Sequence, residues 1–193
     1  MNEVWLVVGL GNPGPTYAGH RHNIGHEVVD LLAERMGAKF KRHLRARSDL
    51  VEGRIGGTPG TKAILAKPRS YMNESGGPVA SVLKSFKVEP DQLIVIHDEL
   101  DIPYGTLRLK KDGGDNGHNG LKSVRRSIGT GDYYRIRFGI GRPPGRQDPA
   151  DFVLSPFGSA ERKELAFFVD RAADSVEALI EDGLEKAQNS YHL

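Results

Sequence analysis

Short apolar runs alternate with amphipathic segments along most of this chain. Residues 5–8 and 93–96 are continuous apolar runs of β type, and the second is the most apolar run of all. Such runs predict buried strands, with the second in a central position covered on both sides. Between them, residues 24–36 place apolar side chains at helical spacing, and Gly37 stands where a C-cap glycine belongs. We therefore expect a strand and then a helix at the start of the chain.

The next segments predict a hairpin and further alternation of helices and strands. Residues 50–55 alternate like an edge strand, a glycine and proline turn follows, and residues 63–66 return as a second strand. Five basic side chains crowd residues 39–47, which we interpret as a solvated connection. Further helices are expected at 78–86, at 121–128 and from Ser159, which is a good N-cap, and further strands at 106–110 and 134–140. This order predicts an α/β fold with a mostly parallel sheet and ligands at the carboxyl ends of its strands.

Composition narrows the class of protein. With 193 residues, of which 38% are hydrophobic, the chain predicts a single domain over residues 1–193. The absence of cysteine excludes a thiol nucleophile and a cysteine-bound metal. No apolar run approaches the roughly 20 residues of a membrane span, and Met1-Asn2-Glu3 lacks the basic start of a signal peptide, so a cytoplasmic protein is expected. A net charge of +2 does not by itself predict a nucleic-acid partner.

The turn after the first strand contains the letters of a dinucleotide fingerprint. Gly9-Leu10-Gly11-Asn12-Pro13-Gly14 matches G-x-G-x-x-G. However, Pro13 and Pro15 stand where free N–H groups should face a phosphate, and Asp30 falls inside a helix instead of at the end of a second strand. The pattern therefore argues against a nicotinamide or flavin cofactor, and no cofactor is expected.

A metal site is a further alternative. His22 and His26 are four residues apart, and Asp98, Glu99 and Asp101 could hold a hard cation. Yet His26 lacks a histidine partner four residues on, and alternate residues of an extended chain point to opposite sides. We expect no metal.

Water activated by a side chain is the remaining chemistry, because the chain has no G-x-S-x-G nucleophile motif. His22 is the favoured base, with Asp98 to fix its tautomer, since both follow apolar strands. Asn12, Asn73 and Asn119 each stand in a polar loop after a strand. Their amides could hold a substrate carbonyl or an oxyanion, although each could instead be a turn residue that bonds its own backbone.

Seven blocks of sequence together resemble the bacterial peptidyl-tRNA hydrolase family, in the order of that family and from about residue 4 to residue 190. They are Gly9-Leu10-Gly11-Asn12-Pro13-Gly14 with Tyr17, Arg21-His22-Asn23-x-Gly25, Lys67-Pro68, Met72-Asn73-x-Ser75-Gly76, His97-Asp98-Glu99-Leu100-Asp101, Gly117-His118-Asn119-Gly120-Leu121-Lys122-Ser123 and Arg135-x-Arg137-x-Gly139-Ile140-Gly141. The blocks are far more specific together than any one of them alone.

The resemblance implies a monomeric, metal-free esterase that cuts the bond between a peptide and the terminal ribose of tRNA, on a twisted mixed sheet with helices on both sides. His22 would be the general base and Asp98 its orienting partner. The resemblance also implies the binding residues: Asn12 and Asn73 for the peptide and ester carbonyl, His118 and Asn119 for substrate or water, Tyr17 and Met72 as cleft walls, and Lys110 and Arg137 for phosphates of the acceptor stem.

This chain departs from the family pattern at two places. His20 stands where the family usually has threonine, and a loop that is usually richer in glycine carries Asp112 and Asn116. The first change could alter the hydrogen bonds around His22, and the second could stiffen the loop. Neither change falls on the proposed catalytic positions.

Basic residues near the glycine-rich loop at residues 112–120, called the glycine loop below, predict a phosphate-binding surface. They are Lys110, Lys111, Lys122, Arg125, Arg126, Arg135 and Arg137. Phosphate contacts carry little sequence information, so many tRNAs should be accepted. Two other classes remain open: an RNA-binding protein without chemistry, and a metal-dependent nuclease.

Overall fold

The computed structural model describes residues 3–192, so Met1-Asn2, on which the targeting prediction partly rests, lies outside the described residues. The centre of the molecule is a seven-stranded sheet in the order β2-β3-β4-β1-β5-β7-β6. The strands are β1 (Trp5–Gly9), β2 (Lys41–His43), β3 (Ser48–Ile55), β4 (Thr61–Pro68), β5 (Leu93–Glu99), β6 (Leu107–Lys111) and β7 (Tyr134–Gly139).

The sheet is mixed, with a parallel centre and antiparallel margins. Strand β1 pairs in parallel with β4 and β5, and β5 pairs in parallel with β7. Strands β2 and β3 add an antiparallel margin next to β4, and β6 adds another next to β7. The predicted α/β class and mixed sheet are confirmed. The carboxyl ends of the four central strands therefore lie at one edge of the sheet.

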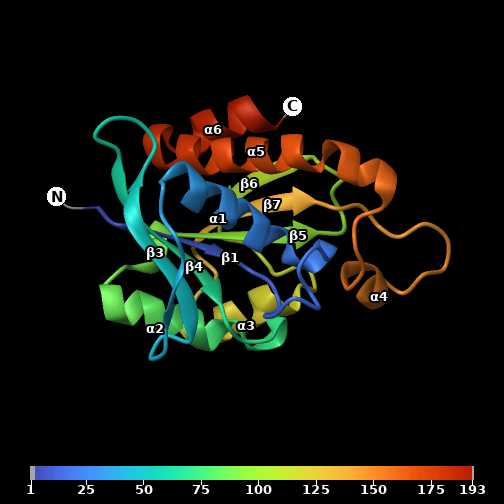
Figure 1. Cartoon of the computed structure of the whole chain (residues 1–193), viewed down its shortest axis with the longest axis horizontal. Coiled ribbons are helices and arrows are strands. Elements are labelled where there is room, and N and C mark those ends of the chain that lie inside the picture. The colour runs from blue at the N-terminus through green and yellow to red at the C-terminus, as the bar shows by residue number, and fades with distance from the viewer. Residues whose placement is uncertain (1–2, 193) are drawn as a thin grey trace.

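Helices cover both faces of the sheet (Figure 1). The helices are α1 (Ile24–Arg35), α2 (Gly76–Phe86), α3 (Asn119–Ile128), α4 (Pro149–Val153), α5 (Ser159–Asp182) and α6 (Leu184–Tyr191), with short 3-10 turns η1 (Arg21–Asn23), η2 (Met72–Glu74) and η3 (Pro90–Gln92). Helices α1, α5 and α6 pack on one face, and α2 and α3 pack on the other (Figure 1). Two hydrophobic cores result, one on each side of the sheet.

Strand β1 explains why its sequence reads as one continuous apolar run. Trp5 and Val7 belong to the core under α1 and α5, whereas Leu6 and Val8 belong to the core over α2 and α3. Successive side chains of a strand point to opposite faces. Both faces of β1 are covered, so every position is buried and apolar.

Three strand predictions need correction. The basic segment at 39–47 is not wholly a loop, because Lys41–His43 form β2 along the outer side of β3. Strand β3 is therefore not the edge strand. Strand β5 continues through Glu99, so Asp98 lies inside the end of the strand and not beyond it. The charged and polar residues of these segments form no hydrophobic pattern that would predict an extended backbone.

The C-terminal part contains two helices that the sequence did not predict, α4 and α6. The long helix α5 begins as expected at Ser159, but its N-cap is Gly158. The Gly158 backbone N–H donates to Oε1 of Glu161 at 2.8 Å, so the glutamate three residues on caps this end instead of the serine. Among the helices within residues 3–192, none has the length and apolar character needed to cross a membrane.

Two glycines allow η1 to sit directly over the strand tips. A Cβ at Gly25 would lie 2.5 Å from the backbone oxygen of Ile96, and one at Gly9 would lie 2.1 Å from the backbone oxygen of Gly25. Any side chain there would push the start of α1 away from β1 and β5. This close contact brings His22, in η1, to the end of β5.

Candidate active site

A cleft of about 470 Å³ opens at the carboxyl ends of the central strands. Seven predicted site residues line it, namely Asn12, His22, Met72, Asn73, Asp98, His118 and Asn119. They come from the loops after β1 and β4, from the end of β5 and from the start of α3. Tyr17 is not among the lining residues and instead lies edge-on to Tyr71, with ring centroids 6.1 Å apart.

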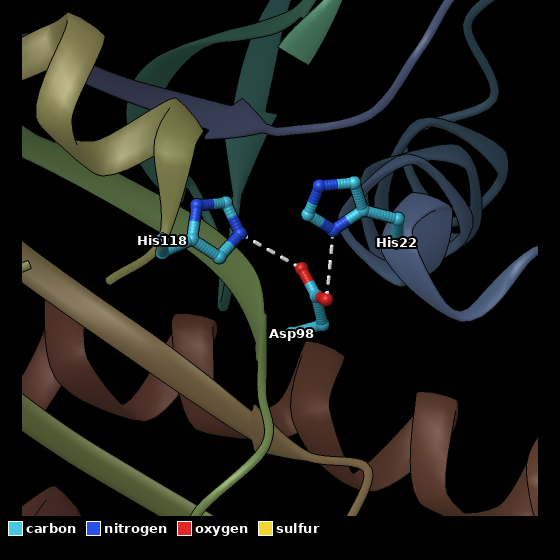
Figure 2. Close-up of side chains that lie close together, drawn as sticks. All are labelled: His22, Asp98 and His118. Carbon is cyan, nitrogen blue, oxygen red and sulfur yellow. Dashed lines mark hydrogen bonds and ion pairs between the residues drawn. The ribbon is translucent and has the colours of Figure 1, made fainter. Parts of the chain in front are cut away.

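The Asp98 carboxylate lies between two histidines (Figure 2). Nδ1 of His22 is 2.8 Å from Oδ2, and Nε2 of His118 is 2.8 Å from Oδ1. Figure 2 shows the two rings on opposite sides of the carboxylate, one from η1 and the other from the start of α3. The expected contact between His22 and Asp98 is therefore present. The second contact, with His118, was not predicted.

Burial and charge set the protonation states of this cluster. Burial opposes ionisation of Asp98, but the adjoining His22 and His118 outweigh it and hold the pKa of the carboxyl well below its usual range. Burial likewise disfavours the charged form of His22, but the Asp98 charge and its hydrogen bond outweigh that effect and raise the pKa of His22. Asp98 thus remains a carboxylate at neutral pH and accepts two hydrogen bonds.

The tautomer of His118 is fixed by helix α3. Its Nδ1 accepts hydrogen bonds from the backbone N–H groups of Gly120 and Leu121, at 3.1 and 3.3 Å, and so caps the helix. Nδ1 must carry a lone pair to accept them, which places the proton of the neutral ring on Nε2, facing Asp98. Both ring nitrogens of His118 are therefore engaged with the protein. A direct bond to substrate would have to break one of these contacts.

His22 differs because only one of its nitrogens is engaged. Nδ1–H donates to Asp98, which leaves the lone pair on Nε2. Within residues 3–192, Nε2 has no hydrogen-bond partner, and the side chain keeps 12% of its surface exposed. This nitrogen can accept a proton from a molecule in the cleft.

The same three side chains offer ligand atoms that lie within 4.8 Å of one another, a spacing that a metal site would also have. A metal on Nε2 of His118 would move the ring proton to Nδ1. That proton would then point at the N–H groups of Gly120 and Leu121, donor against donor. The hydrogen bonds therefore fit a cluster bridged by protons and do not fit a metal ion.

Asn12 is held so that the Nδ2 donor of its side-chain amide stays free. Asn23 and Asn12 bond reciprocally: Asn23 Oδ1 accepts from the Asn12 backbone N–H, and Asn23 Nδ2 donates to the Asn12 backbone oxygen, each at 2.9 Å. Asn12 Oδ1 accepts from the backbone N–H of Met72 at 2.7 Å. The Nδ2 donor of Asn12 therefore remains available to a carbonyl or oxyanion in the cleft.

Asn73 and Asn119 are exposed at the cleft, whereas Met72 is buried beside them. Asn73 lies in η2, and Asn119 is the first residue of α3. Exposure at the start of a helical turn leaves both amides available to a ligand. These two residues thus remain candidates for substrate contacts.

A second, polar pocket of about 360 Å³ lies next to the cleft and contains Lys110 and Arg137. The register pairs Lys110 with Arg135 and His97 with Arg137, so these side chains share the face of the sheet that α3 covers. Burial, together with neighbouring arginines, lowers the pKa of both Lys110 and Arg137, while the carboxylate of Glu99 opposes the shift. The two cations are thus gathered in one place.

Two of the predicted basic residues are engaged with the protein itself, although Arg135 also lines the Lys110–Arg137 pocket. Arg135 is only 1% exposed, and its guanidinium donates to backbone oxygens of the glycine loop, among them Gly113 at 3.0 Å. Lys111 lies on the opposite face of β6, with its Nζ 5.3 Å from the centre of the Tyr134 ring. In contrast, Lys122, Arg125 and Arg126 are exposed on α3, as expected.

Sequence reasoning missed two buried residues that hold the site. Arg21 donates to Glu161 at 2.6 Å and to Oγ of Ser155 at 2.7 Å, and so ties η1 to the segment from α4 to α5. Asn23 fixes the backbone of Asn12. Within the Arg21-His22-Asn23 block, only His22 was given a role from the sequence. The only available signal was that three polar residues directly precede a buried helix face.

Taken together, the fold and the site define an α/β protein with a histidine–carboxylate pair at the carboxyl ends of its parallel strands. A family model described as peptidyl-tRNA hydrolase matches residues 6–193. The chain belongs to the peptidyl-tRNA hydrolase family.

Similar proteins support this assignment over the whole length. Peptidyl-tRNA hydrolase of Frankia casuarinae is 63% identical over 188 residues, which cover 97% of this chain and 93% of the relative. That of Streptomyces coelicolor is 63% identical over 190 residues, which cover 97% and 94%. The crystal structure of the enzyme from Acinetobacter baumannii aligns with a TM-score of 0.90 at 34% identity, over 100% of this chain and 96% of the other.

Proposed function

We propose that this protein hydrolyses the ester bond between a peptide and the 3′-terminal ribose of tRNA, as a monomer and without a metal, using water activated by His22 and Asp98. The observation that carries the proposal is the free Nε2 of His22, on a ring whose Nδ1–H is held 2.8 Å from Asp98 inside an open cleft. Membership of the family supplies the substrate.

The chemistry needs a proton acceptor, an anion stabiliser and a proton donor for the leaving group. Nε2 of His22 takes a proton from water as the water oxygen attacks the ester carbonyl carbon. The carbonyl oxygen becomes an oxyanion, to which Nδ2 of Asn12 can donate. When the bond to the ribose oxygen breaks, that oxygen takes the proton back from His22, and Asp98 stabilises the imidazolium in the meantime.

The remaining predicted residues have separate roles in this proposal. The amides of Asn73 and Asn119 contact the peptide or ester, and Met72 forms part of the wall. His118 positions Asp98 instead of binding substrate, because both of its nitrogens are engaged. Tyr17 stays a prediction for peptide contact, from outside the lining of the cleft. Lys110 and Arg137 bind phosphates of the acceptor stem.

One assay tests the function against its two rivals. Purified protein is incubated with a peptidyl-tRNA and, separately, with an aminoacyl-tRNA that has a free amine, each with and without a strong chelator. We expect release of free peptide and intact tRNA from the first substrate, unchanged by the chelator, and little release from the second. An RNA-binding protein without chemistry would cleave neither substrate. Cleavage within the RNA, or activity that the chelator removes and zinc or magnesium restores, would contradict the proposal.

A further inference from the structure

The catalytic cleft and the Lys110–Arg137 pocket share two lining residues, Glu99 and Asn116. These two are also bonded to each other, because Nδ2 of Asn116 donates to Oε2 of Glu99 at 3.0 Å. The pair therefore forms the boundary between the place where the ester is cut and the place where phosphate binds. Any strand that occupies both sites must cross this boundary.

The Glu99 side chain is held in place but keeps one acceptor unused. Only 6% of Glu99 is exposed, and Asp98 and Glu99 point to opposite faces of β5, so Glu99 faces the pocket side. Asn116 also donates to Oδ2 of Asp101 at 2.7 Å, and Asp101 in turn accepts from Nε of Arg142. Among residues 3–192, no hydrogen-bond donor reaches Oε1 of Glu99.

The backbone of Asn116 fits this holding role. Its φ of 49° lies in the left-handed region, which asparagine adopts more readily than most residues with a side chain. A glycine here would keep the backbone but lose both donated hydrogen bonds. The Asn116 side chain thus supports Glu99.

A carboxylate at this boundary selects what can lie against it. It accepts hydrogen bonds and donates none, so it repels phosphate and favours a hydroxyl or amine. The two ends of the path are both backbone groups of RNA, a ribose ester and a phosphate. The group that lies between them along the same strand is a ribose. Its 2′-hydroxyl is the donor by which a protein can distinguish RNA from DNA.

We propose that Glu99, held by Asn116, accepts a hydrogen bond from a ribose 2′-hydroxyl in the 3′-terminal single strand of the substrate. This inference rests on the proposed function for the path of the strand. Glu99 is then a residue that determines specificity for RNA, while Lys110 and Arg137 supply attraction to any polyanion.

The test uses full-length peptidyl-tRNA in which one of the last three nucleotides at a time carries 2′-deoxyribose. With the natural chain, one of these substitutions should lower kcat/KM by about 10- to 100-fold, because hydrogen bonds to charged groups typically contribute that much. In Glu99→Ala the same substitution should change kcat/KM by less than about threefold. Glu99→Gln keeps a neutral acceptor and should give an intermediate ratio.

The matched control is Asp112→Asn, which removes a negative charge near Lys110 at a residue that lines neither the catalytic cleft nor the Lys110–Arg137 pocket. It should change phosphate affinity alike for ribose and deoxyribose substrates and leave their ratio unaltered. A ratio that stays the same in both Glu99 variants would overturn the proposal. The proposal would also be overturned if a loss of kcat/KM that depends on Glu99 appeared only when a terminal base lacks its exocyclic amine.

A second readout separates this inference from the proposed function. The dissociation constant of uncharged tRNA is measured for the same deoxy-substituted molecules and the same variants. If the natural chain cleaves no peptidyl-tRNA, the proposed function fails, yet a Glu99-dependent preference for ribose in binding would still support the inference. Equal binding of ribose and deoxyribose forms, together with an unchanged kcat/KM ratio, would contradict it.

Discussion

The two walls that flank Asp98 each present a histidine at 2.8 Å, yet the two histidines differ in what their second nitrogen does. On the η1 wall, no group of the described residues bonds Nε2 of His22, which lies in the cleft. On the α3 wall, Nδ1 of His118 accepts from two backbone N–H groups. Distance to the carboxylate therefore does not identify the base. What identifies it is whether the ring nitrogen that faces away from Asp98 has a partner in the protein.

The wall at α3 fixes the proton position of His118. A helix N-terminus presents backbone N–H groups that need an acceptor, so His118 can carry a proton only on Nε2 without breaking the cap. Oδ1 of Asp98 therefore accepts from Nε2–H of His118, and Oδ2 accepts from Nδ1–H of His22. The cap of α3 thus sets the tautomer of His118, and the ionised carboxylate of Asp98 sets that of His22.

Removing His22 should have the largest effect. Of the imidazoles that line the cleft in residues 3–192, His22→Ala takes away the one with a free nitrogen, and general-base catalysis typically contributes about 10² to 10⁴ in rate. Single-turnover cleavage of peptidyl-tRNA should fall by that factor, while the affinity for uncharged tRNA stays within about twofold.

The matched variant for this result is Arg137→Ala, which should behave in the opposite way. It removes one of the two cations in the phosphate pocket, so it should raise KM and flatten the salt dependence of binding, with little change in turnover at saturation. If Arg137→Ala lowers turnover alone, the phosphate role is wrong. If His22→Ala keeps its rate, another group is the base.

Asp98→Asn should lower the rate of cleavage nearly as much, because the tautomer of His118 is fixed and that of His22 is not. The proton on Nε2 of His118 requires the amide oxygen of the new side chain, so the amide NH₂ must face Nδ1 of His22. His22 would then carry its proton on Nε2, the nitrogen that has to accept one. The rate should therefore drop by about 10² to 10⁴ although both imidazoles are retained.

The double variant Asp98→Asn/His118→Ala tests this directly. Without His118 the amide is free to turn its oxygen toward Nδ1 of His22, which restores the useful tautomer. We expect the double variant to be faster than Asp98→Asn alone, by about tenfold, a result that simple additivity forbids. A double variant slower than both single variants would show that His118 does not control the tautomer.

The contact between His22 and Asp98 could be predicted from sequence because Asp98 comes just after the apolar run of β5 and His22 follows β1, two strands that end at the same edge of the sheet. Parallel topology alone brings such residues together. The role of His118 could not be predicted in this way. The family resemblance implied that it holds substrate or water, and only the geometry of the start of α3 shows which nitrogen is occupied.

Similar limits apply to the fold. The central strands β1 and β5 are buried on both faces, and continuous apolar runs predicted them. Strand β2 has the letters Lys41-Arg42-His43 and is held by pairing with β3 instead of by burial, so no hydrophobic pattern marks it. Arg135 was placed with the phosphate ligands by its charge, although its bonds to the backbone oxygens of Gly113 and Gly114 make it a support of the glycine loop.

His118 variants should have smaller effects, split between activity and stability. His118→Ala loses both the helix cap and the contact with Asp98, whereas His118→Asn can still cap α3 because asparagine is a favoured N-cap residue. Thermal or urea unfolding should show a loss of about 1 kcal/mol for His118→Ala relative to His118→Asn. Both variants should lose a similar amount of activity, since neither reaches Asp98. Equal stabilities would mean that the cap contributes nothing.

The smallest expected effect is a shift of the pH profile. His22 must be neutral to accept a proton, and its pKa is raised because the Asp98 charge and hydrogen bond outweigh the effect of burial. Activity should therefore decline as the pH falls through a value above the ordinary histidine pKa of about 6.5. In Asp98→Ala, burial alone remains, so the acidic limb of kcat/KM should move to lower pH.

Asp101→Ala removes a carboxylate that is bonded to Arg142 and Asn116 and not to His22, so it should leave the limb in place. A limb that stays fixed in Asp98→Ala, or moves to higher pH, would mean that Asp98 does not set the protonation of the base.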